Sequence, residues 1–174
     1  MHFNEIPQFP RANYQIHVEW HYLKQQLESW DEPKCDSPLI LNPDFQRGHV
    51  WSDAQRSSFI EYSLKGGTTG KDIYFNCSSW NKKFNTPVYC IDGLQRLTAV
   101  LKFIDNEVPA FGKYFKEYEG KLRIHFCLHM LNISSKKELL KIYLDHNSGG
   151  VIHSQAELIK VQKMIDETNP DEVL

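Results

Sequence analysis

The sequence predicts an α+β fold in which helices pack on a small mixed β-sheet. Apolar and polar residues alternate from Asn13 to Trp20 and from Leu122 to Met130, the period of a half-buried strand. Helix starts are marked by a serine with Gln or Glu three residues later, at Ser52, Ser135 and Ser154. No internal repeat or low-complexity segment interrupts the mixture. Strands and helices interspersed in this way indicate one sheet covered by helices.

The first half of the chain alternates strands and helices. Residues 1–12 are predicted to form an irregular arm, and residues 13–174 a single domain. The first strand runs into a helix near Trp20, because Leu23, Leu27 and Trp30 recur on one helical face. Two prolines make residues 31–38 a loop, and residues 39–41 form a short strand.

The second half continues with the same kinds of signal. Ser52 and Gln55 open a helix that Gly66 and Gly67 stop. Strands follow at residues 71–75 and 88–91, joined by a polar loop. Asp92, with Gln95 three residues later, is predicted to cap the next helix. The later elements are an irregular stretch over 107–120, the strand over 122–130, a helix over 135–144, a loop over 146–150 and a helix from 154.

Composition excludes several classes of protein. The chain has 174 residues, a formal net charge of -2 and 41% hydrophobic residues, which fits one domain with its own core. No apolar run approaches the roughly 20 residues that span a bilayer, and the first ten residues do not resemble a signal peptide. The four cysteines form no CxxC pair. We therefore expect a soluble, cytoplasmic protein with free thiols and no membrane partner.

The segment Ile91 to Arg96 is the sharpest candidate site. A strand ends at Asp92, Gly93 follows and a helix begins, so unpaired N–H groups of the first helical turn favour an anion. Arg96 lies in that turn, where a cation is unfavourable unless an anionic partner compensates. Gln95, in the same turn, is a further candidate residue of this site. The alternative is a simple N-cap followed by an exposed arginine.

Two other segments carry weaker signals. Gln46 and Arg47 precede a glycine, and three of the chain's five arginines, Arg47, Arg56 and Arg96, lie in the two loop-to-helix stretches that contain this segment and the previous one. Arginine suits bidentate phosphate recognition, although a solvated surface loop explains it as well. Asn147, Gly149 and Gly150 form a loop between helices, where glycine N–H groups can face a ligand or simply end a helix.

The strand over 122–130 and the aromatic stretch before it are two further candidate binding sites. Arg123, His125, Cys127 and His129 recur on one strand face, so three of them are possible metal ligands. We favour a polar, partly exposed sheet face, and we predict no protein metal site. Residues 111–118 are aromatic with lysines nearby, which suits single-stranded nucleic acid, but we expect them to cover the core. No Walker A, GxGxxG, GxSxG or HNH pattern is present.

Three segments together resemble the N-terminal domain of GmrSD-type restriction enzymes, which carries a DGQQR signature and belongs to the ParB/sulfiredoxin-like superfamily. They are Pro43 to Trp51 (PDFQRGHVW), Ile91 to Ala99 (IDGLQRLTA) and Asn147 to Gly150 (NSGG), in the family's order. The resemblance covers about residues 14–165. It implies a ParB/sulfiredoxin-like α+β fold and a nucleotide-binding domain linked to phage or bacterial DNA modification and restriction.

The resemblance also assigns roles to residues. It implies a phosphate-binding turn at Asp92, Gly93, Gln95 and Arg96. Gln46 and Arg47 would reach the same pocket, and Asn147, Gly149 and Gly150 would line it. Asp92, Arg96 and Arg47 would be catalytic in NTP hydrolysis or phosphoryl transfer. The implied cofactors are a nucleoside triphosphate, with ATP, GTP and CTP not distinguished, and Mg²⁺.

Two departures from the family pattern shape the expected function. Leu94 replaces the first Gln of the signature, and the chain lacks the HNH-like nuclease domain of restriction members. We therefore expect a stand-alone domain that is not a nuclease by itself, with DNA or modified DNA and a separate nuclease subunit as partners. Two alternatives stay open: a kinase-type transferase acting on a nucleoside, modified DNA or another small hydroxyl substrate, and a non-catalytic DNA-binding or adaptor module.

Overall fold

A computed structural model describes residue 12 and residues 14–31, 38–46, 48–80, 82, 85–148 and 155–174. The strands and helices follow in the predicted order, with two short 3-10 helices added. In chain order they are β1 (Tyr14–Glu19), η2 (Trp20–Tyr22), α1 (Leu23–Trp30), β2 (Leu39–Ile40), α2 (Asp53–Leu64), β3 (Asp72–Asn76), β4 (Val88–Asp92), α3 (Leu94–Ile104), η4 (Phe115–Glu117), β5 (His125–Leu131), α4 (Lys136–Ser148) and α5 (Gln155–Glu167). Of the predicted N-terminal arm, only Ala12 lies within the described residues.

The five strands form one mixed sheet in the order β1-β5-β3-β4-β2. β1 pairs antiparallel with β5, and β3 pairs antiparallel with β4. β3 and β5 run parallel, as do β2 and β4. The prediction of an α+β protein with a small mixed sheet is therefore confirmed.

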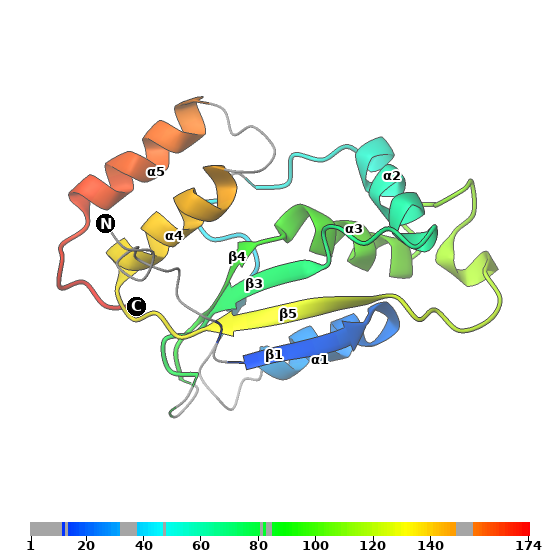
Figure 1. Cartoon of the computed structure of the whole chain (residues 1–174), viewed down its shortest axis with the longest axis horizontal. Helices are drawn as coiled ribbons and strands as arrows, with labels where there is room; N and C mark the ends of the chain where they lie inside the picture. The colour runs from blue at the N-terminus through cyan, green and yellow to red at the C-terminus, as the bar shows by residue number, and fades with distance from the viewer. Residues whose placement is uncertain are drawn as a thin grey trace, which may run out of the picture.

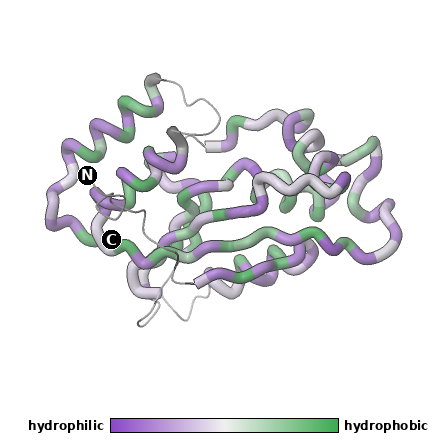
Figure 2. Tube along the Cα trace, viewed as in Figure 1, coloured by the Kyte–Doolittle hydropathy of each residue, from purple (hydrophilic) through white to green (hydrophobic). Residues whose placement is uncertain are grey.

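Helices cover opposite faces of this sheet in two groups. Ile73 and Phe75 of β3 join a core cluster with residues of α1, α2 and α3. Ile91 of β4 and Leu131 of β5 join a second cluster with α4 and α5. Figure 1 shows α4 and α5 paired at the end of the sheet toward which β3 and β5 point, and α2 at the other end. Along α5, hydrophobic and hydrophilic residues alternate, as expected for a helix with one buried face (Figure 2).

β5 differs from the predicted half-exposed strand in its bounds and in its burial. It begins at His125 rather than at Leu122, and all of its residues from Phe126 to Leu131 are buried. Cys127 and His129, which we assigned to a polar, partly exposed face, are each only 8% exposed. The prediction was wrong for these two residues because side chains of the neighbouring strand cover them: the Tyr74 ring stacks on His129, Asp72 bonds it, and the end of β5 packs in the second core cluster.

The predicted capping box at the start of α2 is confirmed. The Ser52 side chain accepts a hydrogen bond from the Gln55 N–H, and the Gln55 side chain accepts one from the Ser52 N–H at 2.8 Å. Two of the four N–H groups that a helix start leaves unpaired are thereby satisfied.

Replacing Ser52 by Ala should lower the free energy of unfolding by about 1 kcal/mol, because the first turn of α2 loses its cap. Ser58→Ala is the matched control: Ser58 is exposed on the same helix and its hydroxyl bonds only the Ala54 carbonyl. Urea unfolding of both variants measures the difference. Equal stability of the two variants would mean that the cap does not stabilise this helix.

The C-terminal helices correct one predicted loop. α4 extends to Ser148, so Asn147 lies in a helix rather than in the predicted loop over 146–150. Gly149 and Gly150 lie outside the described residues, as does Ser154, the predicted cap of α5. No helix among the described residues combines the length and the apolar character needed to cross a bilayer.

Candidate functional site

The turn between β4 and α3 is built around Gly93. Asp92 is the last residue of β4, and Gly93 is the N-cap of α3, with a φ of 98°. The prediction that Asp92 caps this helix was therefore wrong by one residue. The N-cap residue has no side chain that could accept hydrogen bonds from the first-turn N–H groups of α3.

Close packing explains the glycine at position 93. A Cβ placed there would lie 2.4 Å from the Ile73 Cδ1 of the neighbouring strand β3. The positive φ also disfavours any side chain. The bare side of Gly93 thus faces the core, rather than a space into which a phosphate would fit.

Asp92 and Arg96 form an ion pair across the turn. The Arg96 Nη2 lies 2.9 Å from the Asp92 Oδ2, and the two side chains are 20% and 29% exposed. Asp92 thereby supplies the anionic partner that a cation in the first helical turn needs. The Arg96 side chain also lies close to Gly70, two residues before β3, since a Cβ at Gly70 would lie 3.2 Å from the Arg96 Cδ.

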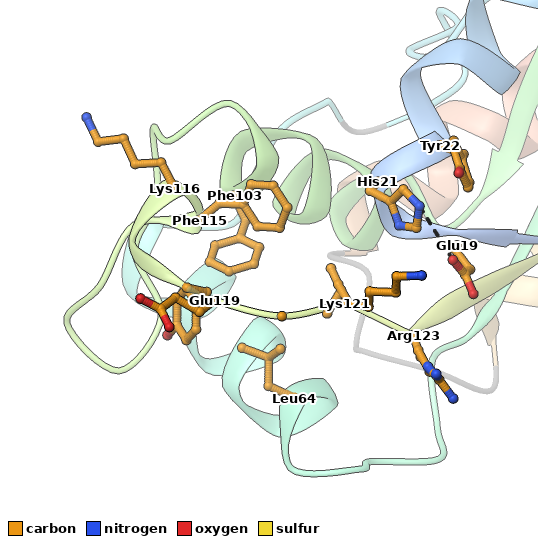
Figure 3. A pocket seen from close by; sticks show the side chains of 13 residues that line it. Glu19, His21, Tyr22, Leu64, Phe103, Phe115, Lys116, Glu119, Lys121 and Arg123 are labelled. Carbon is orange, nitrogen blue, oxygen red and sulfur yellow. Dashed lines mark ion pairs between the residues drawn. The ribbon is translucent and has the colours of Figure 1, made fainter.

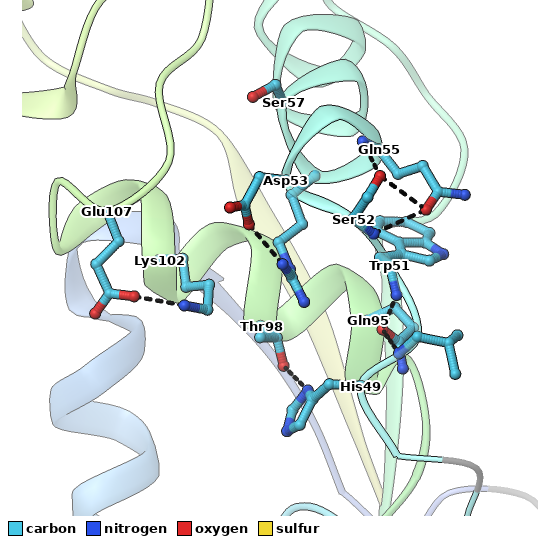
Figure 4. Close-up of polar contacts among 12 residues, drawn as sticks. His49, Trp51, Ser52, Asp53, Gln55, Ser57, Gln95, Thr98, Lys102 and Glu107 are labelled. Carbon is cyan, nitrogen blue, oxygen red and sulfur yellow. Dashed lines mark hydrogen bonds and ion pairs between the residues drawn. The ribbon is translucent and has the colours of Figure 1, made fainter.

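Gln95 is buried and ties the preceding loop to α3. Its Oε1 accepts hydrogen bonds from the Val50 and Trp51 N–H groups at 3.2 Å, and its Nε2 donates to the Gly48 carbonyl. Figure 4 shows the Gln95 amide directed at Trp51, and the His49 ring reaching Thr98 on α3. These contacts give Gln95 a structural role, and its predicted contact with a nucleotide stays a prediction.

Gln46 lies against the strand that leads to the turn. Its amide nitrogen donates to the Cys90 carbonyl of β4, two residues before Asp92. The Gln46 side chain therefore lies beside β4, the strand that leads to the turn, and its predicted contact with a nucleotide stays a prediction. Burial raises the pKa of the Cys90 thiol to about 12, so this thiol stays protonated. Arg47 lies outside the described residues.

No described contact joins the third predicted segment, residues 147–150, to the β4–α3 turn. Asn147 lies in α4, while Gly149 and Gly150 lie outside the described residues. His146, one residue before Asn147, has its ring 4.7 Å from that of Tyr74, which lies on β3 beside Asp92. The end of α4 therefore lies near the strand next to the turn.

Residues on β3 and β5 lie next to the β4–α3 turn, and two of them, Asp72 and Tyr74, were not predicted from the sequence. Tyr74 pairs with Asp92 on one side and with His129 on the other, so the three residues form one row across the sheet. The Tyr74 ring stacks on His129 with centroids 4.4 Å apart. The His129 Nε2 lies 2.7 Å from the Asp72 Oδ1. Asp72 and Tyr74 carried no local motif, and only the strand pairing identifies them.

The charges in this row influence one another. Burial, followed by the carboxylates of Asp72 and Asp92, raises the pKa of the Tyr74 hydroxyl, and the Arg96 cation acts against them. Burial and then Asp72 raise the pKa of the Cys127 thiol. Opposite charges on β3, β4 and α3 are therefore concentrated within one region of the sheet.

A cavity of about 870 Å³ lies away from the turn, beside the C-terminal end of α3. Figure 3 shows Phe103 and Phe115 forming its apolar side, with the Glu19–His21 pair and Lys121 opposite. Phe115 and Tyr118 each pack edge-on against Phe103, which confirms that this part of the aromatic stretch covers the core. None of the predicted nucleotide-binding residues lines this cavity.

Comparison with known proteins identifies a family. A family model described as the N-terminal domain of the GmrSD restriction endonuclease matches residues 27–128, which is more than half of the chain. The match includes the Gln46 segment and the whole β4–α3 turn. No curated protein and no solved structure matches the chain. The chain therefore belongs to the family of GmrSD restriction endonuclease N-terminal domains.

Proposed function

We propose that this domain binds a nucleoside triphosphate at the β4–α3 turn and acts in the restriction of phage or modified DNA. The observation that carries the proposal is the partly exposed Asp92–Arg96 pair at the uncapped N-terminus of α3. Membership of a family named for a restriction endonuclease supports the restriction-related role.

The geometry suits a phosphate in two ways. The first-turn N–H groups of α3 have no side-chain cap and lie at the positive end of the helix dipole. Arg96 projects from the same turn and can form two parallel hydrogen bonds with phosphate oxygens. Gly93 contributes by allowing the sharp change from strand to helix, not by making room for the ligand.

For the chemistry, we propose hydrolysis of the nucleotide. A water oxygen bonds to the terminal phosphorus while the bond to the bridging oxygen breaks, and the bridging oxygen leaves on the diphosphate. Asp92 orients the water and accepts its proton, and Arg96 stabilises the charge on the phosphoryl oxygens. Arg47 is proposed as a second cation, and Mg²⁺, bound with the nucleotide, would add charge stabilisation.

Replacing Arg96 by Ala should weaken nucleotide binding by about 10–100-fold, because charged hydrogen bonds contribute roughly 1.5–3 kcal/mol. Titration calorimetry with ATP, GTP and CTP in the presence of Mg²⁺ measures the affinity. Lys102→Ala is the matched control, since Lys102 lies on the same helix and pairs with the acidic Glu107. We expect the control to bind as the unchanged protein does.

Other results would favour other functions. Failure of the unchanged protein to bind any of the three nucleotides would contradict the proposal. ATP turnover that rises strongly on adding a nucleoside or modified DNA would favour a phosphotransferase. Steeply salt-dependent DNA binding without nucleotide turnover would favour a DNA-binding adaptor for a separate nuclease chain.

A further inference from the structure

The structure brings together three side chains with metal-binding chemistry on β3 and β5. A carboxylate oxygen of Asp72, the Cys127 sulfur and an imidazole nitrogen of His129 all lie within 4.8 Å of one another. Asp72 and Cys127 are paired directly across the two strands, and His129 is two residues further along β5. Residues related in this way project from the same face of a sheet.

We propose that Asp72, Cys127 and His129 form a zinc site with three protein ligands and one open position. Thiolate, imidazole and carboxylate are the ligands that Zn²⁺ takes in proteins, and a three-ligand site leaves its fourth position for water or a substrate. Sulfur and nitrogen ligands also argue against Mg²⁺, which prefers oxygen. This site lies beside the proposed nucleotide site, across Tyr74, but shares no ligand with it and does not depend on it.

The site is preorganised by its surroundings. His129 is buried, its ring is stacked on Tyr74, and its Nε2 is hydrogen-bonded to Asp72 at 2.7 Å. Two ligands of a tetrahedral zinc ion lie about 3.3–3.5 Å apart for bond lengths of 2.0–2.2 Å. A bound metal would therefore replace this hydrogen bond, and it would increase the distance between the two atoms by less than about 1 Å.

The position of the three residues leaves one side accessible. Asp72 is 58% exposed, whereas Cys127 and His129 are buried beneath it. His17 pairs with Cys127 from β1 and is exposed on the neighbouring strand, but it does not belong to the group that shares the 4.8 Å separation. An open coordination position would therefore face solvent beside Asp72.

A nucleophilic cysteine is the competing explanation of the same three residues. A catalytic thiol needs an adjacent base that takes its proton. The His129 Nε2 is instead hydrogen-bonded to Asp72 at 2.7 Å, and all three groups lie within 4.8 Å of one another. This arrangement suits three ligands of one ion better than a nucleophile paired with its base.

Zinc binding to the full chain, measured by competition with a chelating dye, tests the proposal. We expect one equivalent of Zn²⁺ to bind, and Cys127→Ser and Asp72→Asn to weaken it by more than about tenfold, the loss caused even by removing outer partners of metal ligands. His17→Ala is the matched control and should retain the affinity. Absence of binding, or equal affinity in all four proteins, would overturn the proposal.

Two measurements on the unchanged protein keep the test independent of how the variants fold. Co²⁺ should give the visible absorption of a tetrahedral site together with a thiolate charge-transfer band. Zn²⁺ should slow alkylation of Cys127 by iodoacetamide, while Cys77 and Cys90, which are fully buried, stay unmodified with or without the metal. An unchanged rate at Cys127 would overturn the assignment of its sulfur as a ligand.

Discussion

Gly93→Ala is expected to lower the free energy of unfolding by about 4 kcal/mol, the largest effect of any single change considered for this chain. A side chain at φ 98° costs about 1–3 kcal/mol of backbone strain. The added Cβ would meet the Ile73 Cδ1 at 2.4 Å, and overpacking in a filled core costs about 1–3 kcal/mol. Thermal unfolding should show a fall in Tm of roughly 8–16 °C for a chain of this size.

A second glycine separates the two causes. Gly120 has a φ of 94°, close to that of Gly93, but nothing lies within 4 Å of its missing Cβ. Gly120→Ala should therefore show the backbone cost alone. Ile73→Val removes the Cδ1 atom, so it should recover part of the stability lost in Gly93→Ala. If Gly93→Ala were no worse than Gly120→Ala, packing against Ile73 would not explain the glycine.

Gln95→Ala is expected to cost about 2–4 kcal/mol. It removes the acceptor for the Val50 and Trp51 N–H groups and the donor to the Gly48 carbonyl. A buried group left unpaired costs about 1–3 kcal/mol, and these three part-buried groups together cost less than three times that because water reaches them. Hydrogen exchange at the Val50 and Trp51 amides should become faster. Chemical unfolding gives the change in stability, and exchange locates it.

Gln55→Ala is the control for this variant. Gln55 also bonds a backbone N–H, that of Ser52, but on an exposed helix start where water can replace it. Its loss should cost about 1 kcal/mol or less. An equal cost for the two variants, or unchanged exchange at Val50 and Trp51, would contradict the proposed role of Gln95 in holding the loop.

The order of strands and helices could be predicted because its signals are local. The Ser52–Gln55 capping box and the helical face of Leu23, Leu27 and Trp30 depend only on residues within one or two turns. The ion pair of Asp92 and Arg96 could also be predicted, since the two residues are four positions apart. It was missed because Asp92 was interpreted as the N-cap of the helix.

The burial of β5 and the group around His129 could not be predicted locally. Alternation indicates which residues share a face, but not which strand lies beside them. Asp72 and His129 are 57 residues apart and meet only because β3 and β5 run in parallel. The sequence pattern therefore singled out Arg123, His125, Cys127 and His129 without Asp72. Arg123 precedes β5, and neither Arg123 nor His125 is in the group that the structure assembles.

The most direct test of the central claim is a crystal structure of this chain with a non-hydrolysable nucleoside triphosphate and Mg²⁺. The account predicts that a phosphate lies at the N-terminus of α3, within hydrogen-bond distance of the Arg96 guanidinium and of the first-turn N–H groups. A nucleotide bound elsewhere, for instance in the cavity beside Phe103 and Phe115, with the Asp92–Arg96 turn empty, would contradict it.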